Sequence, residues 1–335
     1  MQKLTRCYPS PILLGSICLG ALVLFAYISR SSEVPPTAII LSCPHVMGAL
    51  QETKPAPTWP PPGAPPPELA AAFRGPDDSM VLGSYYVAQR YEGAGEYVLD
   101  WNAAHVTKYC AAIASGESCG TYGCGEVNDL KLALQLLSRS RGGSGGLEGT
   151  IGMVMGSEQP WVECLALNLG AEEVWTFEYG RVMSTHPRLK AKPYKELAAE
   201  YARGRGVPLD WVVSFSSLEH SGLGRYGDPL NPEGDTEAMQ QAWCMLKPGG
   251  MMLLAVPMSC RNAGRLEFNA HRVYGFQRLA HIAAGFELVS WASTACDSSN
   301  QGMQQPTILL RKPLHAPAAK LYAADFAFAA SKFAS

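Results

Sequence analysis

Polar and ionisable residues are concentrated in one stretch of the sequence, directly after an apolar segment predicted to be a buried strand over residues 209–215. The candidates there for proton transfer and ligand binding are Ser216, Glu219, His220, Arg225, Tyr226 and Asp228. In an open α/β sheet, ligands bind beyond the carboxyl ends of the strands. A connection without such a role is usually shorter and less polar. The stretch therefore predicts a site at the end of that strand.

Histidines in and near this stretch are the candidate general bases. His220 lies within it, and His271 follows the next predicted strand. Histidine is the side chain whose ordinary pKa is nearest to neutrality, which suits it to accept a proton. Glu219 is the third catalytic candidate. For each histidine the alternative is a structural role, with the ring hydrogen-bonded beneath a loop.

Two arginines are candidate substrate-binding residues, together with Tyr226. Arg225 and Arg272 could bind a carboxylate or phosphate through their planar donor groups. The alternative is that they pair with Asp228 and Asp235 of the same region, and Asp228 is itself a substrate-binding candidate.

A cofactor site is predicted around the first strand of the α/β pattern, over residues 150–155. Gly156 and Ser157 follow that strand, where a glycine allows the backbone to approach a ligand closely. Glu178 ends the second strand, where an acidic side chain typically accepts hydrogen bonds from ribose hydroxyls. With Ser216 they form the predicted cofactor-binding set.

The segments around these residues alternate between short apolar runs and helical patterns. The predicted strands are 150–155, 174–178, 188–191, 209–215, 250–256, 286–291 and 307–311. The predicted helices are 100–115, 127–137, 160–169, 194–203, 236–245 and 274–284. Strands that alternate with helices indicate a doubly wound, mostly parallel sheet of the Rossmann-like class.

Longer motifs carry a resemblance to known families. Leu-Glu-His at 218–220 and Leu-Lys-Pro-Gly-Gly at 246–250 resemble the second half of a class I S-adenosylmethionine-dependent methyltransferase. The stretches GSEQPWVECLALNLGA, SFSSLEHSGLGRYGDPLNPEGD and FNAHRVYG resemble the domain-of-unknown-function family 268. The resemblance implies a methyltransferase-type fold with S-adenosylmethionine lying across Gly156, Glu178 and the loop after Phe215. The chain departs from the methyltransferase pattern in having a single glycine in its first loop and no acidic residue after the third strand.

The leading hypothesis is a membrane-anchored methyltransferase that acts on a hydroxyl of a glycan or another acceptor. The second is a non-catalytic Rossmann-like module that binds a sugar, a nucleotide or a protein partner. The third is a metal-dependent, glycan-modifying enzyme. Its ligands would be Glu219, His220, Asp228, Asp235 and His271.

An uncharged segment at residues 11–28 is long enough to cross the hydrocarbon layer of a membrane as a helix. Basic residues before it outnumber those just after it, which favours a cytoplasmic N-terminus and a lumenal remainder in the Golgi or endoplasmic reticulum. A cleaved signal peptide and a transit peptide are the alternatives. The sequence predicts five parts of the chain. They are an anchor at 1–30, a Pro-rich stem at 31–75, a helical extension at 76–146, the Rossmann-like domain at 147–314 and a peripheral Ala-rich tail at 315–335.

Composition limits the possible partners. The net charge is -2 and Lys and Arg are not clustered, so the footprint of a nucleic-acid-binding protein is missing. Ten cysteines are present. The spacing of Cys119 and Cys124 allows a small disulfide-closed loop, with buried free thiols as the alternative, and it does not match a structural zinc site.

Overall fold

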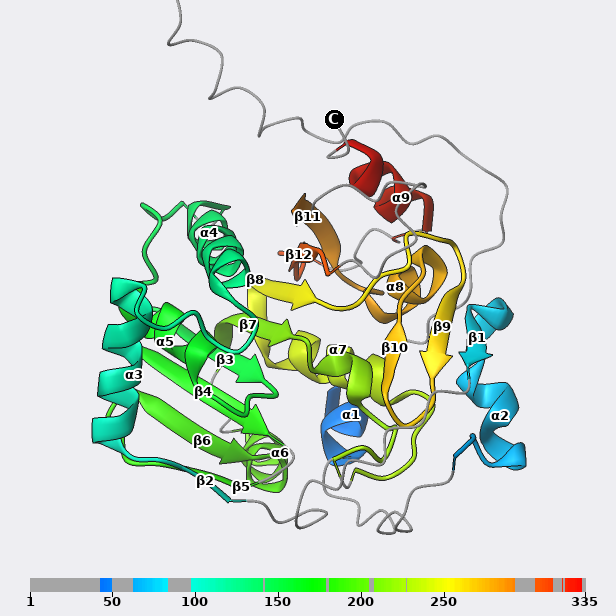
Figure 1. Ribbon diagram of the computed structural model, residues 1–335, viewed down its shortest axis with the longest axis horizontal. Coiled ribbons are helices and arrows are strands. Elements are labelled where there is room, and N and C mark those ends of the chain that lie inside the picture. Colours follow the sequence, from blue (N-terminus) through cyan, green and yellow to red (C-terminus); the bar gives the residue numbers. More distant parts are fainter. Residues whose placement is uncertain are drawn as a thin grey trace, which may run out of the picture. The chain divides into compact units, whose positions relative to one another are not determined.

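The fold of the chain is known from a computed structural model (Figure 1). The residues it describes are 43–49, 63–83, 98–140, 142–178, 181–204, 208–226, 228–292, 305–315, 321 and 323–332. The chain divides into two compact units, Met1–Pro35 and Pro36–Ser335, and every described residue belongs to the second. The segment predicted to span a membrane, 11–28, lies outside the described residues. Among the helices that are described, none has the length and apolar character needed to cross a bilayer.

A seven-stranded sheet forms the centre of the fold, in the order β11-β12-β8-β7-β3-β4-β6. Its strands are β3 (Ile151–Met155), β4 (Glu173–Glu178), β6 (Leu189–Pro193), β7 (Leu209–Phe215), β8 (Leu246–Ala255), β11 (Glu287–Ala292) and β12 (Thr307–Arg311). Strands β6, β4, β3, β7 and β8 are parallel, while β12 is antiparallel to both β8 and β11. The order matches a doubly wound dinucleotide-type sheet with one antiparallel strand inserted beside the fifth. The predicted mixed α/β fold with a mostly parallel sheet is confirmed.

The central strands are apolar on both faces, as a parallel sheet covered by helices requires. Every residue of β7 is buried. Gly152 in β3 lies directly against the indole of Trp211, and a Cβ at this position would overlap the ring. A glycine is needed here so that a full tryptophan can pack across the neighbouring strand.

Helices cover both faces of the sheet (Figure 1). One core joins the sheet to α3 (Ala103–Ser115), α4 (Cys124–Ser140) and α5 (Trp161–Asn168). The other core joins it to α1 (Cys43–Ala49), α6 (Tyr194–Ala202), α7 (Gly234–Met245), α8 (Phe276–Ile282) and α9 (Ala323–Lys332). The side chains alternate along β3, so that Met153 and Met155 face the second core while Val154 faces the first.

Two small sheets contain strands that were not predicted from the sequence. Strand β1 (Met80–Gly83) pairs with β9 (Gly264–Glu267), which also pairs with β10 (His271–Val273). Strand β2 (Val98–Trp101) pairs with β5 (Arg181–Ser184). Three short helical elements complete the described structure. They are α2 (Pro67–Phe73), η1 (Pro76–Asp78) and η2 (Leu218–His220).

Most predicted elements are found within a few residues of their expected bounds. Helix α3 begins after Asn102, whose side chain accepts a hydrogen bond from the His105 amide and so caps the helix. Strand β8 begins at Leu246, earlier than predicted, because the Lys-Pro-Gly-Gly segment already belongs to the strand.

Two predictions about the ends of the domain are corrected. The tail was expected to be peripheral, but Phe326 of α9 is fully buried and its ring lies 6.4 Å from that of Trp291. The segment 76–146 was expected to be a separate helical extension, but α3 and α4 contribute to one of the two cores of the sheet. Both segments pack onto the domain because they carry apolar side chains, and exposing these to water would cost the free energy gained by burying them.

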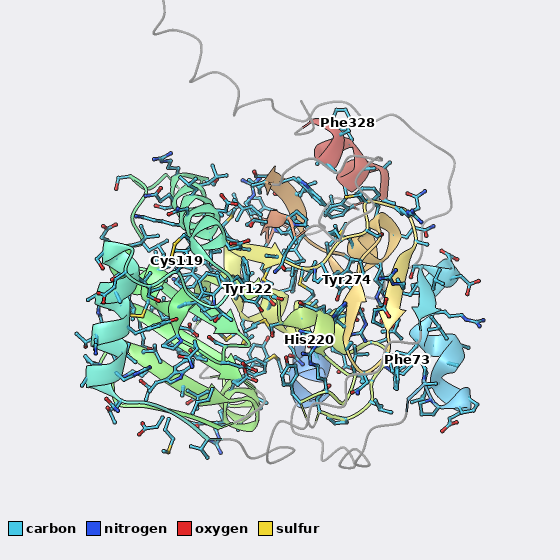
Figure 2. The ribbon with its side chains drawn as sticks, viewed as in Figure 1. Phe73, Cys119, Tyr122, His220, Tyr274 and Phe328 are labelled. Carbon is cyan, nitrogen blue, oxygen red and sulfur yellow. A yellow bond between two sulfur atoms is a disulfide. The ribbon has the colours of Figure 1, made fainter. Side chains whose placement is uncertain are left out.

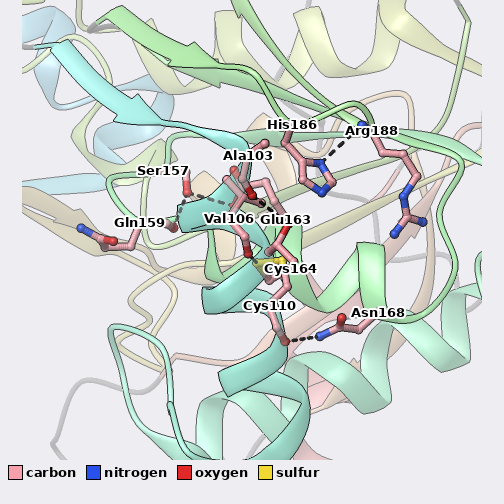
Figure 3. Close-up of a disulfide and its surroundings, with 11 residues drawn as sticks. Ala103, Val106, Cys110, Ser157, Gln159, Glu163, Cys164, Asn168, His186 and Arg188 are labelled. Carbon is pink, nitrogen blue, oxygen red and sulfur yellow. Dashed lines mark hydrogen bonds between the residues drawn. A yellow bond between two sulfur atoms is a disulfide. The ribbon is translucent and has the colours of Figure 1, made fainter.

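Three disulfides join described cysteines. They are Cys43–Cys244, Cys110–Cys164 and Cys119–Cys124. Cys260 is disulfide-bonded as well. The bond between Cys110 and Cys164 joins α3 to α5, and Asn168 donates a hydrogen bond to the Cys110 carbonyl beside it, at 2.9 Å (Figure 3).

Candidate active site at the ends of β3 and β7

The loops after β3 and β7 meet at the point where the strand order of the sheet reverses. From β3 the chain continues toward β4 and β6, whereas from β7 it continues toward β8. The crevice at such a switch point is the usual ligand site of an open α/β sheet. The two loops touch, because a Cβ on Gly156 would overlap the side chain of Ser217. Gly156 also has a φ of 76°, a conformation that side chains disfavour.

The loop after β3 brings together three of the predicted cofactor residues. The Ser157 amide donates to Glu178 Oε2 at 2.7 Å, which places the carboxylate at the end of β4 beside the loop that begins with Gly156. The Ser157 hydroxyl donates to the Gln159 carbonyl at 2.8 Å. The loop is therefore ordered by its own hydrogen bonds.

Glu163 was missed by the sequence analysis and lies beneath this loop, in the first turn of α5 (Figure 3). Its carboxylate accepts a hydrogen bond from the Thr176 hydroxyl, at 2.8 Å, and its other oxygen lies 3.2 Å from the Ser157 hydroxyl. Burial raises its pKa to about 7, and the charge of Glu178 adds to the effect. A single glutamate within the apolar run WVECLALNL was the available signal, because a buried acid requires partners.

Ser216 and Glu219 form the centre of the site at the end of β7. Ser216 has a φ of 50°, unusual for a residue with a side chain, and strain of this kind is often found at functional sites. Its hydroxyl donates to Glu219 Oε1 at 2.9 Å. Glu219 is 1% exposed, and its second oxygen, Oε2, is buried without a hydrogen-bond partner. Burial raises the pKa of Glu219 to about 7, although Arg225 and Arg272 oppose the shift.

The two predicted bases, His220 and His271, lie close together, but their pKa values are lower than a general base at neutral pH requires. His220 Nδ1–H donates to the Ala270 carbonyl at 2.6 Å, so Nε2 carries the lone pair and lies 3.7 Å from Glu219 Oε1. Burial and then the charge of Arg225 lower the pKa of His220 to about 3. The same two causes lower the pKa of His271, whose ring centroid is 6.2 Å from that of His220. A group with a pKa near 3 takes up protons poorly at neutral pH, so Glu219 replaces His220 as the better candidate base.

Arg225 and Tyr226 remain candidates for binding a substrate. Both are partly exposed. Arg225 donates to the Ala270 carbonyl at 3.1 Å, and its guanidinium carbon is 5.3 Å from the centroid of the Tyr226 ring. The Tyr226 ring also contacts His220 edge to face, at 5.4 Å.

Asp228 and Arg272 are corrected from substrate-binding to structural roles. The Asp228 carboxylate is buried and accepts backbone amide hydrogens from Gly222, Gly224 and Tyr226, so it organises the loop from within. Arg272 is 2% exposed and lies 3.5 Å from Asp235, so the alternative of a structural ion pair applies to it.

The proposed set of metal ligands is not brought together. Within the described part of the chain, no group of three or more His, Cys, Asp or Glu side chains is placed to hold a metal ion. Asp235 and Asp228 are engaged elsewhere, with buried arginines and with backbone amides.

An aromatic cluster beside Ser216 was also missed. Tyr122 lies in the loop closed by the Cys119–Cys124 disulfide, and its ring contacts those of Trp161 and Phe215. Burial raises the pKa of Tyr122, and the Ser216 side chain opposes this shift. Tyr122 is 43% exposed, and Figure 2 shows it in the central part of the fold, where His220 is also labelled. No sequence pattern linked it to a strand end more than 90 residues away.

The fold and the site thus define a doubly wound α/β domain with its polar site at the switch point. Residues 149–314 match the model of the family described as "Caenorhabditis protein of unknown function, DUF268". The resemblance of this segment to that family is therefore confirmed. A search of curated proteins finds no match.

Solved structures with a similar mixed α/β fold include methyltransferases. N-methyltransferase NodS from Bradyrhizobium japonicum, in complex with S-adenosyl-L-homocysteine, is 14% identical with a TM-score of 0.34, over 56% of this chain and 87% of that chain. The [4+2]-cyclase SpnF is 15% identical with a TM-score of 0.36, over 66% and 99% of the two chains. A protein from Lactococcus lactis provisionally described as a hemolysin is 13% identical with a TM-score of 0.38, over 59% and 93%.

Proposed function

We propose that this domain is an S-adenosylmethionine-dependent methyltransferase that acts on a hydroxyl group, with Glu219 as the proton acceptor. The observation that carries the proposal is the buried Glu219 carboxylate at the switch point, with one oxygen bonded to Ser216 and the other without a partner. A strained residue beside an unpaired, pKa-shifted acid is typical of a functional site. A purely structural acid would have its hydrogen bonds satisfied.

The residues around the switch point are compatible with the cofactor. Gly156 has no side chain of its own and lets the loop after β3 approach Ser217 of the loop after β7, and the Glu178 carboxylate lies next to that glycine through its bond to Ser157. Gly156, Ser157, Glu178 and Ser216 would hold the nucleoside and amino-acid parts of S-adenosylmethionine. When bound, this cofactor supplies an activated methyl group on its sulfonium.

A proton path leads from the surface of the site to Glu219. Ser216 is partly exposed and donates to the carboxylate, whereas Glu219 itself is buried. An acceptor hydroxyl that bonds to Ser216 Oγ can lose its proton to that oxygen while Ser216 passes its own proton to Glu219. Tyr122 packs against Phe215, the residue before Ser216, and would line this path. A relay of this kind is general base catalysis through one intervening hydroxyl.

We further propose a membrane-anchored protein with a lumenal domain, acting on a glycan or another hydroxylated acceptor. The segment at 11–28 supports the anchor. The disulfides of the domain support an oxidising compartment, because such bonds rarely persist in the cytosol.

Cofactor binding is tested by thermal stability of the full-length chain with S-adenosylmethionine and with S-adenosylhomocysteine. A ligand at about 100 times its dissociation constant stabilises the folded state by about 2.7 kcal/mol. Glu178→Gln, which keeps an acceptor for the Ser157 amide, is expected to weaken the shift. Glu287→Gln on β11, whose carboxylate pairs with Arg311, is the matched control and should leave the shift unchanged.

The second candidate is a non-catalytic Rossmann-like binding module. It is favoured by the closed loop after β3, in which both the amide and the hydroxyl of Ser157 already have partners within the protein. Absence of any shift with either cofactor form, in a protein that unfolds cooperatively, would favour this candidate over the methyltransferase.

A further inference from the structure

Arg225 differs from the other arginines packed around the loop after β7. Among the described residues it donates a hydrogen bond from Nη1 to the Ala270 carbonyl, at 3.1 Å. Its Nε is buried and has no hydrogen-bond partner. By contrast, Arg272 and Arg278 each lie against the Asp235 carboxylate and donate to backbone carbonyls as well. A guanidinium has five N–H donors, so Arg225 retains unused capacity to donate.

The surroundings of Arg225 hold it in place without neutralising it. Its Nη1 shares the Ala270 carbonyl with His220 Nδ1, and the Tyr226 ring lies under its guanidinium. Within the described part of the chain, no carboxylate forms an ion pair with it. The charge of Arg225 lowers the pKa of the Glu219 carboxylate. That carboxylate accepts its hydrogen bond from Ser216 and not from Arg225.

The charge of Arg225 acts on four titratable groups of the proposed site. It lowers the pKa of His220, His271 and Glu219, and it opposes the upward shift at Tyr122. Arg225 therefore lies among the residues where an acceptor would bind, and not at the edge of the domain.

We propose that Arg225 binds an oxyanion, a carboxylate, phosphate or sulfate, carried by the acceptor. This rests on the proposed function and names its substrate class: an acidic, hydroxylated molecule such as a uronic acid or a phosphorylated or sulfated sugar. The oxyanion accepts hydrogen bonds from guanidinium N–H groups that have no partner among the described residues, while a hydroxyl of the same molecule reaches Ser216. The exposed ring of Tyr122 provides an apolar wall on which a sugar ring can rest.

Arginine suits this role better than lysine would. Its planar fork can donate two parallel hydrogen bonds to an oxyanion, and its guanidinium already lies over the Tyr226 ring before the ligand arrives. A neutral His220 beside it adds an acceptor for a ligand hydroxyl and no competing positive charge.

The experiment measures the melting temperature of the full-length chain as chloride is replaced, at constant ionic strength, by inorganic phosphate, inorganic sulfate or D-glucuronate. D-glucose serves as the neutral control. The variants are Arg225→Gln and Arg225→Lys, and Arg139→Gln on the exposed face of α4 is the matched control. Comparison between variants removes the general stabilising effect of sulfate and phosphate on proteins.

We expect a saturable stabilisation of the wild type by at least one oxyanion and none by glucose. Loss of a charge-assisted bidentate pair should weaken the apparent affinity of Arg225→Gln by about tenfold or more. Arg225→Lys should fall between the two, and Arg139→Gln should match the wild type. The anion that saturates at the lowest concentration distinguishes a carboxylate source from a phosphate or sulfate source.

The inference is overturned if no oxyanion stabilises the wild type in a saturable way, or if the wild type and Arg225→Gln respond equally. If Arg225→Gln does not fold, the comparison of Arg225→Lys with the wild type decides in the same way. The stabilisation by S-adenosylmethionine, measured on the same proteins, separates the two proposals. Its absence together with a retained oxyanion response rejects the methyltransferase alone, and the reverse result rejects the oxyanion subsite alone.

Discussion

The loop after β7 contributes to two neighbouring clusters of charged residues. They differ in whether the buried charged groups are paired with one another. In the first, Asp235 lies between Arg272 and Arg278, and Tyr274 donates to the same carboxylate at 3.1 Å. The second is formed by Ser216, Glu219, His220 and Arg225, and there Glu219 Oε2 and Arg225 Nε are buried without a hydrogen-bond partner. We refer to the first as the Asp235 network and to the second as the Glu219 cluster.

The pKa values of the acids in the two groups shift in opposite directions. Burial alone would raise the pKa of Asp235, but the charges of Arg272 and Arg278 outweigh it and lower the pKa to about 2. Burial dominates at Glu219 and raises its pKa to about 7. Both acids are fully buried, so the difference comes from pairing and not from depth.

Of the two buried acids, Asp235 has a structural role and Glu219 does not. In the Asp235 network, the two arginines also donate to carbonyls of the 219–232 segment, so the network holds the loop in its shape. In the Glu219 cluster, unsatisfied atoms are retained beside a strained residue, at a cost that a structural role would not justify. The paired network therefore serves as the support, and the unpaired cluster as the site.

The largest effect is expected from Asp235→Ala. Removing the carboxylate leaves Arg272 and Arg278 buried without their shared counter-charge, which typically costs about 3–5 kcal/mol of the free energy of unfolding. Urea unfolding at neutral pH measures the loss. Glu233→Gln is the control, because the Glu233 side chain is 41% exposed and contacts only Arg278 of the two arginines. Equal losses in the two variants would mean that the network does not support the loop.

A smaller effect, on turnover and not on folding, is expected from Glu219→Gln. Loss of a general base typically slows the reaction by about a hundredfold or more. Since the pKa of Glu219 is raised to about 7, kcat/KM of the wild type should fall as the pH drops below about 7, where the acid is protonated. The pH profile of methyl transfer should become flat in the variant.

Stability provides the control for Glu219→Gln. The folded pKa lies above the ordinary value of 4.5, so the folded protein holds this proton more tightly than the unfolded chain does. The resulting stability is present below about 4.5 and is lost as the pH rises through about 7. Glu219→Gln should lessen that loss, and a variant that is instead less stable at high pH would indicate a structural role for the acid.

The smallest effect is expected from His220→Gln. The pKa of His220 is lowered to about 3, so the ring is neutral at every pH at which the protein would be assayed. The apparent pKa near 7 in the profile of kcat/KM should therefore persist in this variant. If it disappeared in His220→Gln and persisted in Glu219→Gln, the base would be the histidine after all.

Much of the fold could be predicted from local patterns. Fully buried strands such as β7 are encoded within a few residues, and the structure has β7 at the predicted place. Helix α3 begins at Ala103, a few residues after the predicted start, because Asn102 caps it. The pairing of β1 with β9 could not be predicted, because it joins Met80 to Gly264 and each strand is only four residues long. The burial of α9 could not be predicted either, because it results from the contact of Phe326 with Trp291, a residue outside the helix.

For the site, the strand pattern was enough to predict that the residues directly after β3, β4 and β7 lie together. A strand that ends at Phe215 must deliver the next residues to the carboxyl edge of the sheet, and the same holds for Gly156 after β3 and Glu178 in β4. The folded chain added Tyr122 and Glu163 to them, and its long-range contacts set the role of each side chain. Arg272 is separated from Ser221 by 51 residues and Arg278 from Asp235 by 43, yet these contacts settle which charges are paired. The pKa of a buried group depends on its partners and on the water around it, and both are set by segments distant in the sequence.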